Sequence, residues 1–155
     1  MKFNNAQEAF ELLYDKVQAE GVVFDNTKAL FNVGFYIDNP IDRSIDTDFR
    51  RWNCKYAEKE WQWYLSGDPN ADEIAKGAPI WYKMMDKQGN VRSNYGWQWM
   101  RNNQLQKIVS KLRDNPLTRH AAISIYDGKE IDTYQKDTPC TYAVQFTIVE
   151  DKLNM

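Results

Sequence analysis

Apolar residues recur at helical spacing in several segments of the chain. In the first of these, Phe10, Leu13 and Val17 lie three or four positions apart, so residues 4–20 are predicted to form a helix with one apolar face. Gly21 follows as a typical residue to end it. The same reasoning predicts further helices over 49–65 with a cap at Asp46 or Thr47, and over 71–76, 80–85 and 102–115.

Other segments are rich in β-branched and aromatic residues and predict strands. Residues 22–24 and 29–37 form two extended runs around the turn-forming cluster 25–27, which favours a hairpin. Strands are also predicted over 121–126 and 141–149, and an extended segment begins at 153–155. The block 93–99 has no clear period.

Helices mixed with extended runs indicate the α+β class, with a mixed or antiparallel sheet packed against helices. The chain has 155 residues, of which 43% are hydrophobic, and this length suits one core. No repeat or low-complexity linker divides it. We therefore expect a single domain over 1–155.

Charge excludes some classes of partner. The 20 basic residues nearly balance the 22 acidic ones, and no basic stretch could follow a phosphate backbone, which argues against duplex nucleic acid. The amino terminus lacks the pattern of a secretory signal, and no apolar run approaches the length of a membrane span. We expect a cytoplasmic protein without a membrane partner.

Two cysteines are candidates for chemistry. Their spacing fits no metal site, and a reducing compartment argues against a disulfide between them. Cys54 lies on an apolar helical face and is interpreted as structural. Cys140 follows Pro139 where a polar loop meets a strand, a place where a nucleophile could be partly exposed. Arg119 and His120, at the head of the neighbouring strand, are candidates to stabilise its thiolate.

Several blocks, taken in order, resemble the thymidylate synthases and the related phage deoxycytidylate hydroxymethylases. The resemblance covers roughly 49–153. It is carried by Glu60-Trp61-Gln62-Trp63-Tyr64 with Ser66-Gly67-Asp68-Pro69-Asn70, by Ile80-Trp81, by Ser93-Asn94-Tyr95-Gly96-Trp97-Gln98-Trp99, by Asn115-Pro116-Leu117-Thr118-Arg119-His120, and by Pro139-Cys140-Thr141 with Gln145-Phe146. Each block alone is a weak signal, whereas their order and spacing together are specific.

The resemblance implies a folate-dependent transfer of one carbon to C5 of a pyrimidine deoxynucleotide monophosphate. Cys140 matches the thiolate that adds to C6 of the ring and makes C5 nucleophilic toward 5,10-methylenetetrahydrofolate. Glu60 matches the family's catalytic glutamate. Tyr95 matches a tyrosine that hydrogen-bonds a water near the ring. Trp81 matches a tryptophan that packs against ligands.

The resemblance also implies residues that bind substrate. Arg119 matches the first of two adjacent arginines that reach the phosphate across a homodimer interface, and His120 stands in the place of the second. Gln145 matches a glutamine on the strand that leaves the cysteine, with a supporting role. Asn94 is a further candidate.

Thr141, where synthases usually carry histidine, favours the hydroxymethylase branch. Hydroxymethylation of dCMP or dUMP is therefore the leading hypothesis, with methylation of dUMP by a synthase proper as an alternative. The second half of the family pattern has no match, so the expected fold is that of thymidylate synthase without its C-terminal part. A non-catalytic nucleotide-binding or interaction domain, and a thiol hydrolase that pairs Cys140 with His120, remain as further alternatives.

Overall fold

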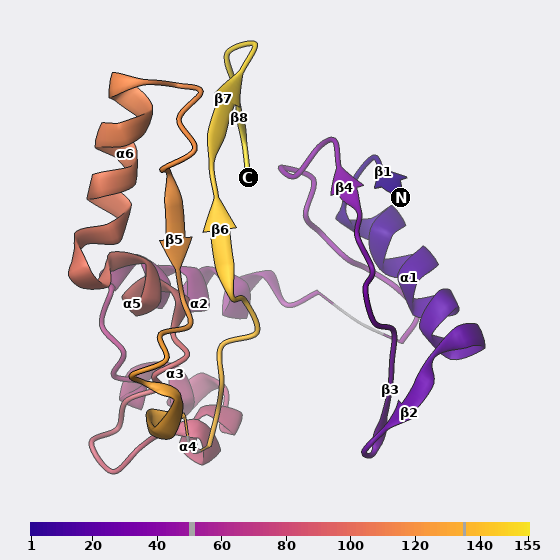
Figure 1. Cartoon of the computed structure of the whole chain (residues 1–155). Helices are drawn as coiled ribbons and strands as arrows, with labels where there is room; N and C mark the ends of the chain where they lie inside the picture. Colours follow the sequence, from indigo (N-terminus) through magenta and orange to yellow (C-terminus); the bar gives the residue numbers. More distant parts are fainter. Residues whose placement is uncertain (50–51, 135) are drawn as a thin grey trace. The chain divides into compact units, whose positions relative to one another are not determined.

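The computed structural model describes residues 1–49, 52–134 and 136–155. Contacts group the chain into two compact units, Met1–Asn53 and Cys54–Met155, and each is described by itself (Figure 1). The single domain over 1–155 stays a prediction. Within the described ranges, no helix is both long enough and apolar enough to span a bilayer.

The first unit contains the predicted helix and hairpin. Helix α1 (Ala6–Glu20) begins where the Asn5 side chain accepts a hydrogen bond from the Glu8 amide, a typical N-cap. Strands β2 (Val22–Phe24) and β3 (Thr27–Ala29) form the antiparallel hairpin. The extended run predicted over 29–37 is wrong as one strand, because Asn32 adopts a φ of 56° and interrupts it. Ala29 ends β3, and at the far end of the run β4 (Tyr36–Ile37) pairs in parallel with β1 (Lys2–Phe3).

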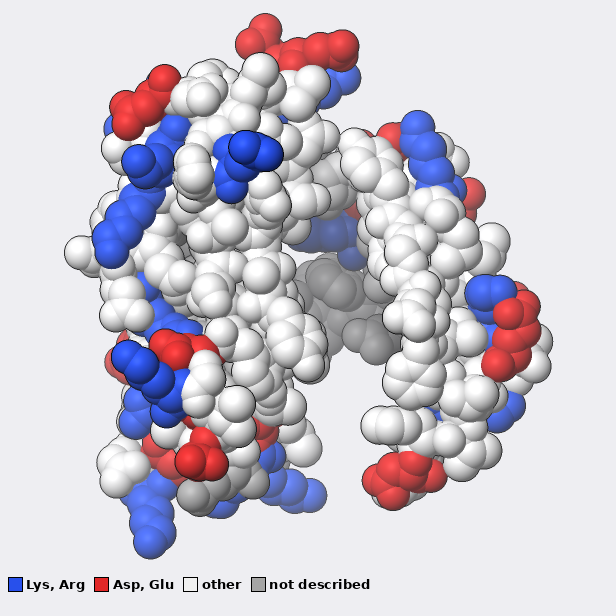
Figure 2. All heavy atoms as spheres, viewed as in Figure 1, with Lys and Arg blue, Asp and Glu red and all other residues white. Residues whose placement is uncertain are grey.

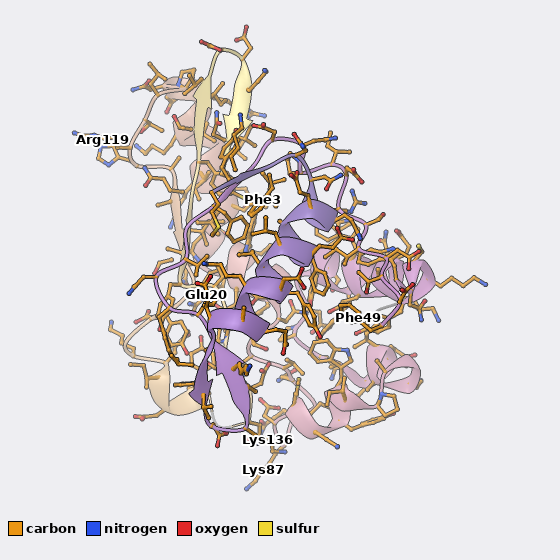
Figure 3. The ribbon with its side chains drawn as sticks, turned by 90° about the vertical axis from the view of Figure 1, so that its right-hand side faces the viewer. Phe3, Glu20, Phe49, Lys87, Arg119 and Lys136 are labelled. Carbon is orange, nitrogen blue, oxygen red and sulfur yellow. The ribbon has the colours of Figure 1, made fainter. Side chains whose placement is uncertain are left out.

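The helix predicted from a cap at Asp46 or Thr47 begins later than expected, at Cys54. The Asp46 amide donates to the Gln7 side chain at 2.8 Å, and its carbonyl accepts from the same side chain at 3.0 Å. These bonds tie Asp46 to α1. Phe49 stacks on Tyr14 with ring centroids 4.7 Å apart, so it packs within the first unit, as Figure 3 shows. Residues 50–51 of the predicted helix lie outside the described residues.

Helices make up the first part of the second unit. They are α2 (Cys54–Ser66), α3 (Asp72–Gly77), α4 (Ile80–Met84), α5 (Tyr95–Met100), the short 3-10 turn η1 (Arg101–Asn103) and α6 (Gln104–Asp114). The predictions for 71–76, 80–85 and 102–115 are thus confirmed to within two residues. Helix α5 lies in the block without a clear period. It is capped by the Asn94 side chain, which accepts from the Trp97 amide at 2.8 Å.

The strands of this unit form two antiparallel pairs. Strand β5 (Ala122–Ser124) pairs with β6 (Ala143–Gln145), and β7 (Thr147–Val149) pairs with β8 (Lys152–Asn154). The strand predicted over 141–149 is therefore divided at Phe146. Figure 1 shows α6 alongside β5, and Ile108 of α6 is buried in one core with Ile123 and Phe146. Helices packed on small, mainly antiparallel sheets confirm the α+β class.

Candidate active site

All eight residues singled out from the sequence lie in the second unit, and four of them gather around one face of α2. Pro139 is buried and Cys140, the next residue, is exposed. The Cys140 amide donates to the Tyr95 hydroxyl at 3.1 Å. This bond joins the end of a loop to the first residue of α5, although 45 positions separate the two. The backbone of Cys140 is thereby fixed at the phenol of Tyr95, and its thiol is exposed.

Glu60 is connected to Tyr95 through a second tyrosine, Tyr64. The Tyr64 hydroxyl donates to Oε1 of Glu60 at 2.6 Å, one helical turn along α2. The ring of Tyr64 meets the ring of Tyr95 edge to face, with centroids 6.0 Å apart. Cys140, Tyr95, Tyr64 and Glu60 thus form a continuous chain of contacts, which we call the cysteine–glutamate chain. Burial raises the pKa of Tyr64, and the hydrogen bond and charge of Glu60 raise it further.

A glycine allows α5 to approach α2 this closely. A Cβ atom placed on Gly96 would lie 1.7 Å from the carbonyl oxygen of Tyr64, far inside van der Waals contact. Gly96 is buried, and it directly follows Tyr95. The absence of a side chain here is what lets Tyr95 and Tyr64 touch.

Trp81 contacts two aromatic residues of α2, Tyr56 and Trp63. Its indole nitrogen donates to the Tyr56 hydroxyl at 2.8 Å, and its ring meets that of Trp63 edge to face at 5.1 Å. Burial raises the pKa of Tyr56, and the Trp81 hydrogen bond lowers it, while the charge of Glu60 and a hydrogen bond with it raise it. Glu60 therefore has tyrosines four residues before and four residues after it on α2, and the first of them holds Trp81.

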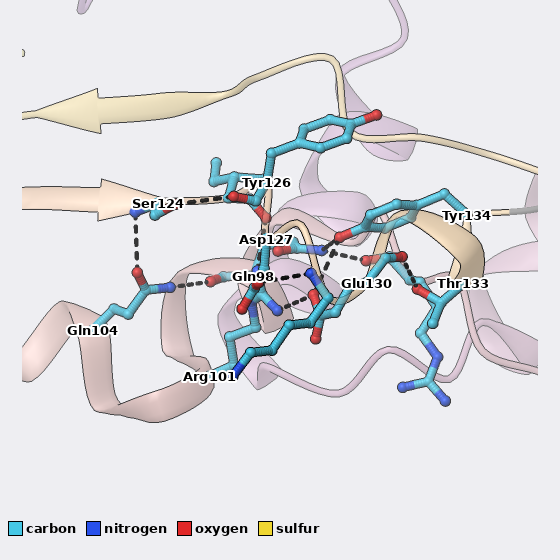
Figure 4. Close-up of polar contacts among 12 residues, drawn as sticks. Gln98, Arg101, Gln104, Ser124, Tyr126, Asp127, Glu130, Thr133 and Tyr134 are labelled. Atoms are coloured by element: carbon cyan, nitrogen blue, oxygen red, sulfur yellow. Dashed lines mark hydrogen bonds and ion pairs between the residues drawn. The ribbon is translucent and has the colours of Figure 1, made fainter.

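The loop that ends at Cys140 is fastened to α5 and η1 by buried polar groups (Figure 4). Gln98, fully buried, donates to the Tyr134 hydroxyl at 3.0 Å. Arg101 pairs with Glu130 and donates to the carbonyl of Ile125 at 2.7 Å. This loop includes η2 (Ile131–Thr133). Its fixed position is what places Cys140 against Tyr95.

A cavity of about 570 Å³ lies beside this loop. It is lined by charges of both signs, including Asp86, Lys87, Arg92 and Lys136, while Cys140 is not among the lining residues. Figure 2 shows acidic and basic side chains close together in the lower part of this unit. Burial alone would raise the pKa of Asp86, but two backbone amides of its loop and Arg92 outweigh it and hold that pKa below its usual value.

Three predicted binding residues lie on or beside the β5–β6 strand pair. The antiparallel register pairs Ala122 with Gln145 and Ser124 with Ala143, so Arg119 and His120 precede β5 and Gln145 ends β6. In Figure 3, Arg119 lies at the opposite end of the unit from Lys136, four residues before Cys140. That Arg119 and His120 stabilise the thiolate, and that His120 pairs with Cys140, stay predictions.

Comparison with known proteins points to one family. The family model described as thymidylate synthase matches residues 27–155. The chain is 32% identical over 115 residues to the deoxycytidylate 5-hydroxymethyltransferase of Enterobacteria phage T4, covering 68% of this chain and 46% of that protein. It is also 32% identical over 101 residues to the thymidylate synthase of Wigglesworthia glossinidia brevipalpis, covering 59% of this chain and 38% of that protein.

This chain belongs to the thymidylate synthase family. The solved structure of thermostable thymidylate synthase A from Bacillus subtilis matches 95% of this chain and 61% of its own, with a TM-score of 0.63 and 18% identity. That likeness shows the fold and confirms the fold predicted from the sequence blocks. The chain spans less than half the length of the curated relatives it matches.

Within this family fold, the predicted residues fall into groups. Cys140, Tyr95 and Glu60 are brought together, and Trp81 is joined to them through Tyr56. Asn94 is buried and caps α5, so it has a structural contact, and its binding role stays a prediction. Gln145, exposed on β6, lies toward the end of the strand pair that is distant from Cys140, and its supporting role also stays a prediction.

The position of Cys54 differs from the one expected from the sequence. It is exposed at the first position of α2, not packed on an apolar face. It therefore offers a second accessible thiol against which the behaviour of Cys140 can be compared.

Sequence reasoning missed Tyr56, Tyr64 and Gly96 as site residues. Tyrosines at positions four before and four after Glu60 share its helical face, and this spacing is visible in the sequence. Gly96 carries no such signal, because the need for a glycine arises only from the approach of α5 to α2.

Proposed function

We propose that Cys140 is the nucleophile of a one-carbon transfer to C5 of a pyrimidine deoxynucleotide monophosphate, most specifically the hydroxymethylation of dCMP. The observation that carries this proposal is the cysteine–glutamate chain. An exposed thiol, a phenol and a carboxylate are the groups that addition to C6 and proton removal from C5 require. Relatives of both the hydroxymethyltransferase and the synthase kind support the reaction class.

The proposed reaction begins at the sulfur. Cys140 forms an S–C6 bond, and the electron pair of the C5=C6 bond moves onto C5, which then attacks the one-carbon unit. Methylenetetrahydrofolate supplies that unit when bound. A water held by Tyr95 and Glu60 would take the proton from C5. The electron pair of the broken C5–H bond would then form a double bond to the new carbon as the bond between that carbon and the folate nitrogen breaks. Water adds to that carbon, and expulsion of the Cys140 thiolate restores C5=C6.

Trp81 fits a role beside the planar folate. Its indole N–H is engaged by Tyr56, so what it offers a ligand is the surface of its half-buried ring rather than a hydrogen bond. Adduct formation that depends on folate should therefore weaken in a Trp81→Leu variant, while binding of the nucleotide alone persists.

A mass measurement tests the nucleophile. The chain is incubated with a 5-fluoro-pyrimidine deoxynucleotide and methylenetetrahydrofolate, and intact and peptide masses are recorded. Fluorine at C5 cannot leave as a proton does, so the covalent adduct accumulates. We expect one adduct on Cys140, its loss in Cys140→Ser, and its retention in Cys54→Ser, the matched control at the other exposed cysteine. Product analysis with dCMP and with dUMP then distinguishes hydroxymethylation from methylation.

A second candidate is a domain that binds nucleotide without turnover, favoured by the partial coverage of the relatives. A folded chain that binds the nucleotide and forms no adduct on Cys140 supports that candidate and contradicts the nucleophile proposal.

The position of Arg119 supports action on a second copy of the chain. It precedes β5, while Cys140 precedes the antiparallel partner β6, so the two residues flank opposite ends of this strand pair, and a phosphate beside that sulfur would be bound by the Arg119 of a second copy. Mixing Cys140→Ser chains with Arg119→Ala chains should restore part of the adduct that Arg119→Ala chains lose alone. No recovery on mixing would contradict a shared site.

A further inference from the structure

Two phenols flank the carboxylate of Glu60 on the same face of α2. Tyr56 and Tyr64 stand four residues before and four after it, so all three side chains lie in one row. The Tyr64 hydroxyl donates to Oε1 of Glu60 at 2.6 Å. We propose that Tyr64 positions the Glu60 carboxylate for proton transfer at C5 of the pyrimidine, an inference that rests on the proposed function.

The direction of the hydrogen bond supports this role. In the bond between Tyr64 and Glu60, the Tyr64 hydroxyl is the donor and Oε1 of Glu60 the acceptor. Burial and the Glu60 charge both raise the pKa of Tyr64, so its hydroxyl keeps its proton across the working range of pH. Glu60 therefore faces a constant donor, which restricts the rotation of its carboxylate.

Tyr64 also connects Glu60 to the thiol. Its ring packs against Tyr95, whose hydroxyl accepts the amide proton of Cys140. Having accepted that bond, the Tyr95 hydroxyl can direct its own proton toward a water or the ring. A Glu60 carboxylate that no longer bonds to Tyr64 would lose its fixed position relative to the Tyr95 phenol. Displacement of a catalytic group by about 1 Å greatly slows the reaction that it assists.

The test separates proton transfer from addition. In D₂O, reversible addition of Cys140 to C6 lets C5 of the nucleotide gain deuterium and lose its proton when the sulfur leaves, without any folate. The loss of the C5 proton signal is followed by NMR for the unsubstituted chain, Tyr64→Phe, Glu60→Gln and the double variant. Tyr82→Phe is the control, because Tyr82 is 53% exposed on the neighbouring α4.

Tyr64→Phe keeps the ring and removes only the hydroxyl. We expect it to slow C5 exchange by about tenfold, a fraction of what a general base contributes, with the yield of the 5-fluoro adduct and the melting temperature unchanged. The double variant should exchange no more slowly than Glu60→Gln alone, because Tyr64 acts through Glu60. Tyr82→Phe should exchange at the unsubstituted rate.

Each other outcome overturns the inference. If the unsubstituted chain forms no adduct and shows no exchange, the proposed function and the role of Tyr64 fail together. If it does both and Tyr64→Phe exchanges at the same rate, only the role of Tyr64 fails. A Tyr64→Phe variant that loses adduct yield and melting temperature in parallel, or whose effect simply adds to that of Glu60→Gln, would show that the hydroxyl serves structure alone.

Discussion

Replacing Gly96 by alanine tests the close contact of α5 with α2. The added Cβ would lie 1.7 Å from the Tyr64 carbonyl oxygen, 2.5 Å from its carbonyl carbon and 2.7 Å from its Cα. These are backbone atoms of a helix, so they cannot rotate away as a flexible side chain would. Helix α5 must instead shift by about 2 Å to reach ordinary van der Waals contact.

The magnitude follows from two opposing effects. Overpacking of this kind costs about 1–3 kcal/mol or more, whereas alanine in a helix gains at most about 1 kcal/mol over glycine. The net loss should be about 2 kcal/mol in the free energy of unfolding, which corresponds to roughly 8–15 °C in melting temperature for a unit of this size. Because the shift also separates Tyr95 from Tyr64, the adduct on Cys140 should form more slowly.

Urea unfolding followed by circular dichroism measures the free energy. Gly77→Ala is the matched control, since a Cβ at Gly77 meets nothing within 4 Å and the residue ends α3. That substitution should be neutral or slightly stabilising. A Gly96→Ala variant as stable as the Gly77→Ala variant would refute the close approach of the two helices.

Three further substitutions test the rest of the second unit. Arg101→Met leaves the Glu130 carboxylate without its cation in a site where Arg101 is 9% exposed, and it should lower the free energy of unfolding by about 2–4 kcal/mol in urea titrations. Asp86 has a lowered pKa, so its ionised carboxylate stabilises the folded state above its unfolded pKa, and this stabilisation is lost as pH falls through the folded pKa. The free energy of unfolding, measured from pH 7 to pH 2, should therefore fall less steeply in Asp86→Asn. Glu150 and Asp151 both have positive φ in the β7–β8 turn, a conformation that asparagine and glycine adopt more easily. The double substitution Glu150→Asn with Asp151→Gly should therefore raise the free energy of unfolding by about 1 kcal/mol, measured as a higher melting temperature.

Elements with a long apolar period could be predicted from the sequence, and shorter ones could not. Helix α6 shows its apolar face over three turns and ends before Pro116 as expected. Helix α5 has six residues, too few for a period to emerge among aromatic side chains, and its one visible signal is Asn94 as a cap. The left-handed conformation of Asn32, which ends the predicted strand, has no cue stronger than the asparagine itself.

The connections between the candidate site residues could not be predicted from the sequence. The order of the sequence blocks singled out Cys140, Tyr95 and Glu60, and their catalytic roles stay predictions. The bond of Cys140 to Tyr95 depends on how a polar loop folds back onto α5. That is a property of packing between distant segments, which neither propensity nor periodicity encodes.

One short segment determines how the thiol is presented. Tyr95, Gln98 and Arg101 follow one another at three-residue intervals from α5 into η1, so they lie near one side of it. The first binds the Cys140 amide, and the other two hold the loop that leads to it. Gly96 brings this same segment against the helix that carries Glu60. The position of Cys140 relative to Glu60 is thus set by this segment, and under the proposed function substitutions at Gly96 and Arg101 should both slow adduct formation at Cys140.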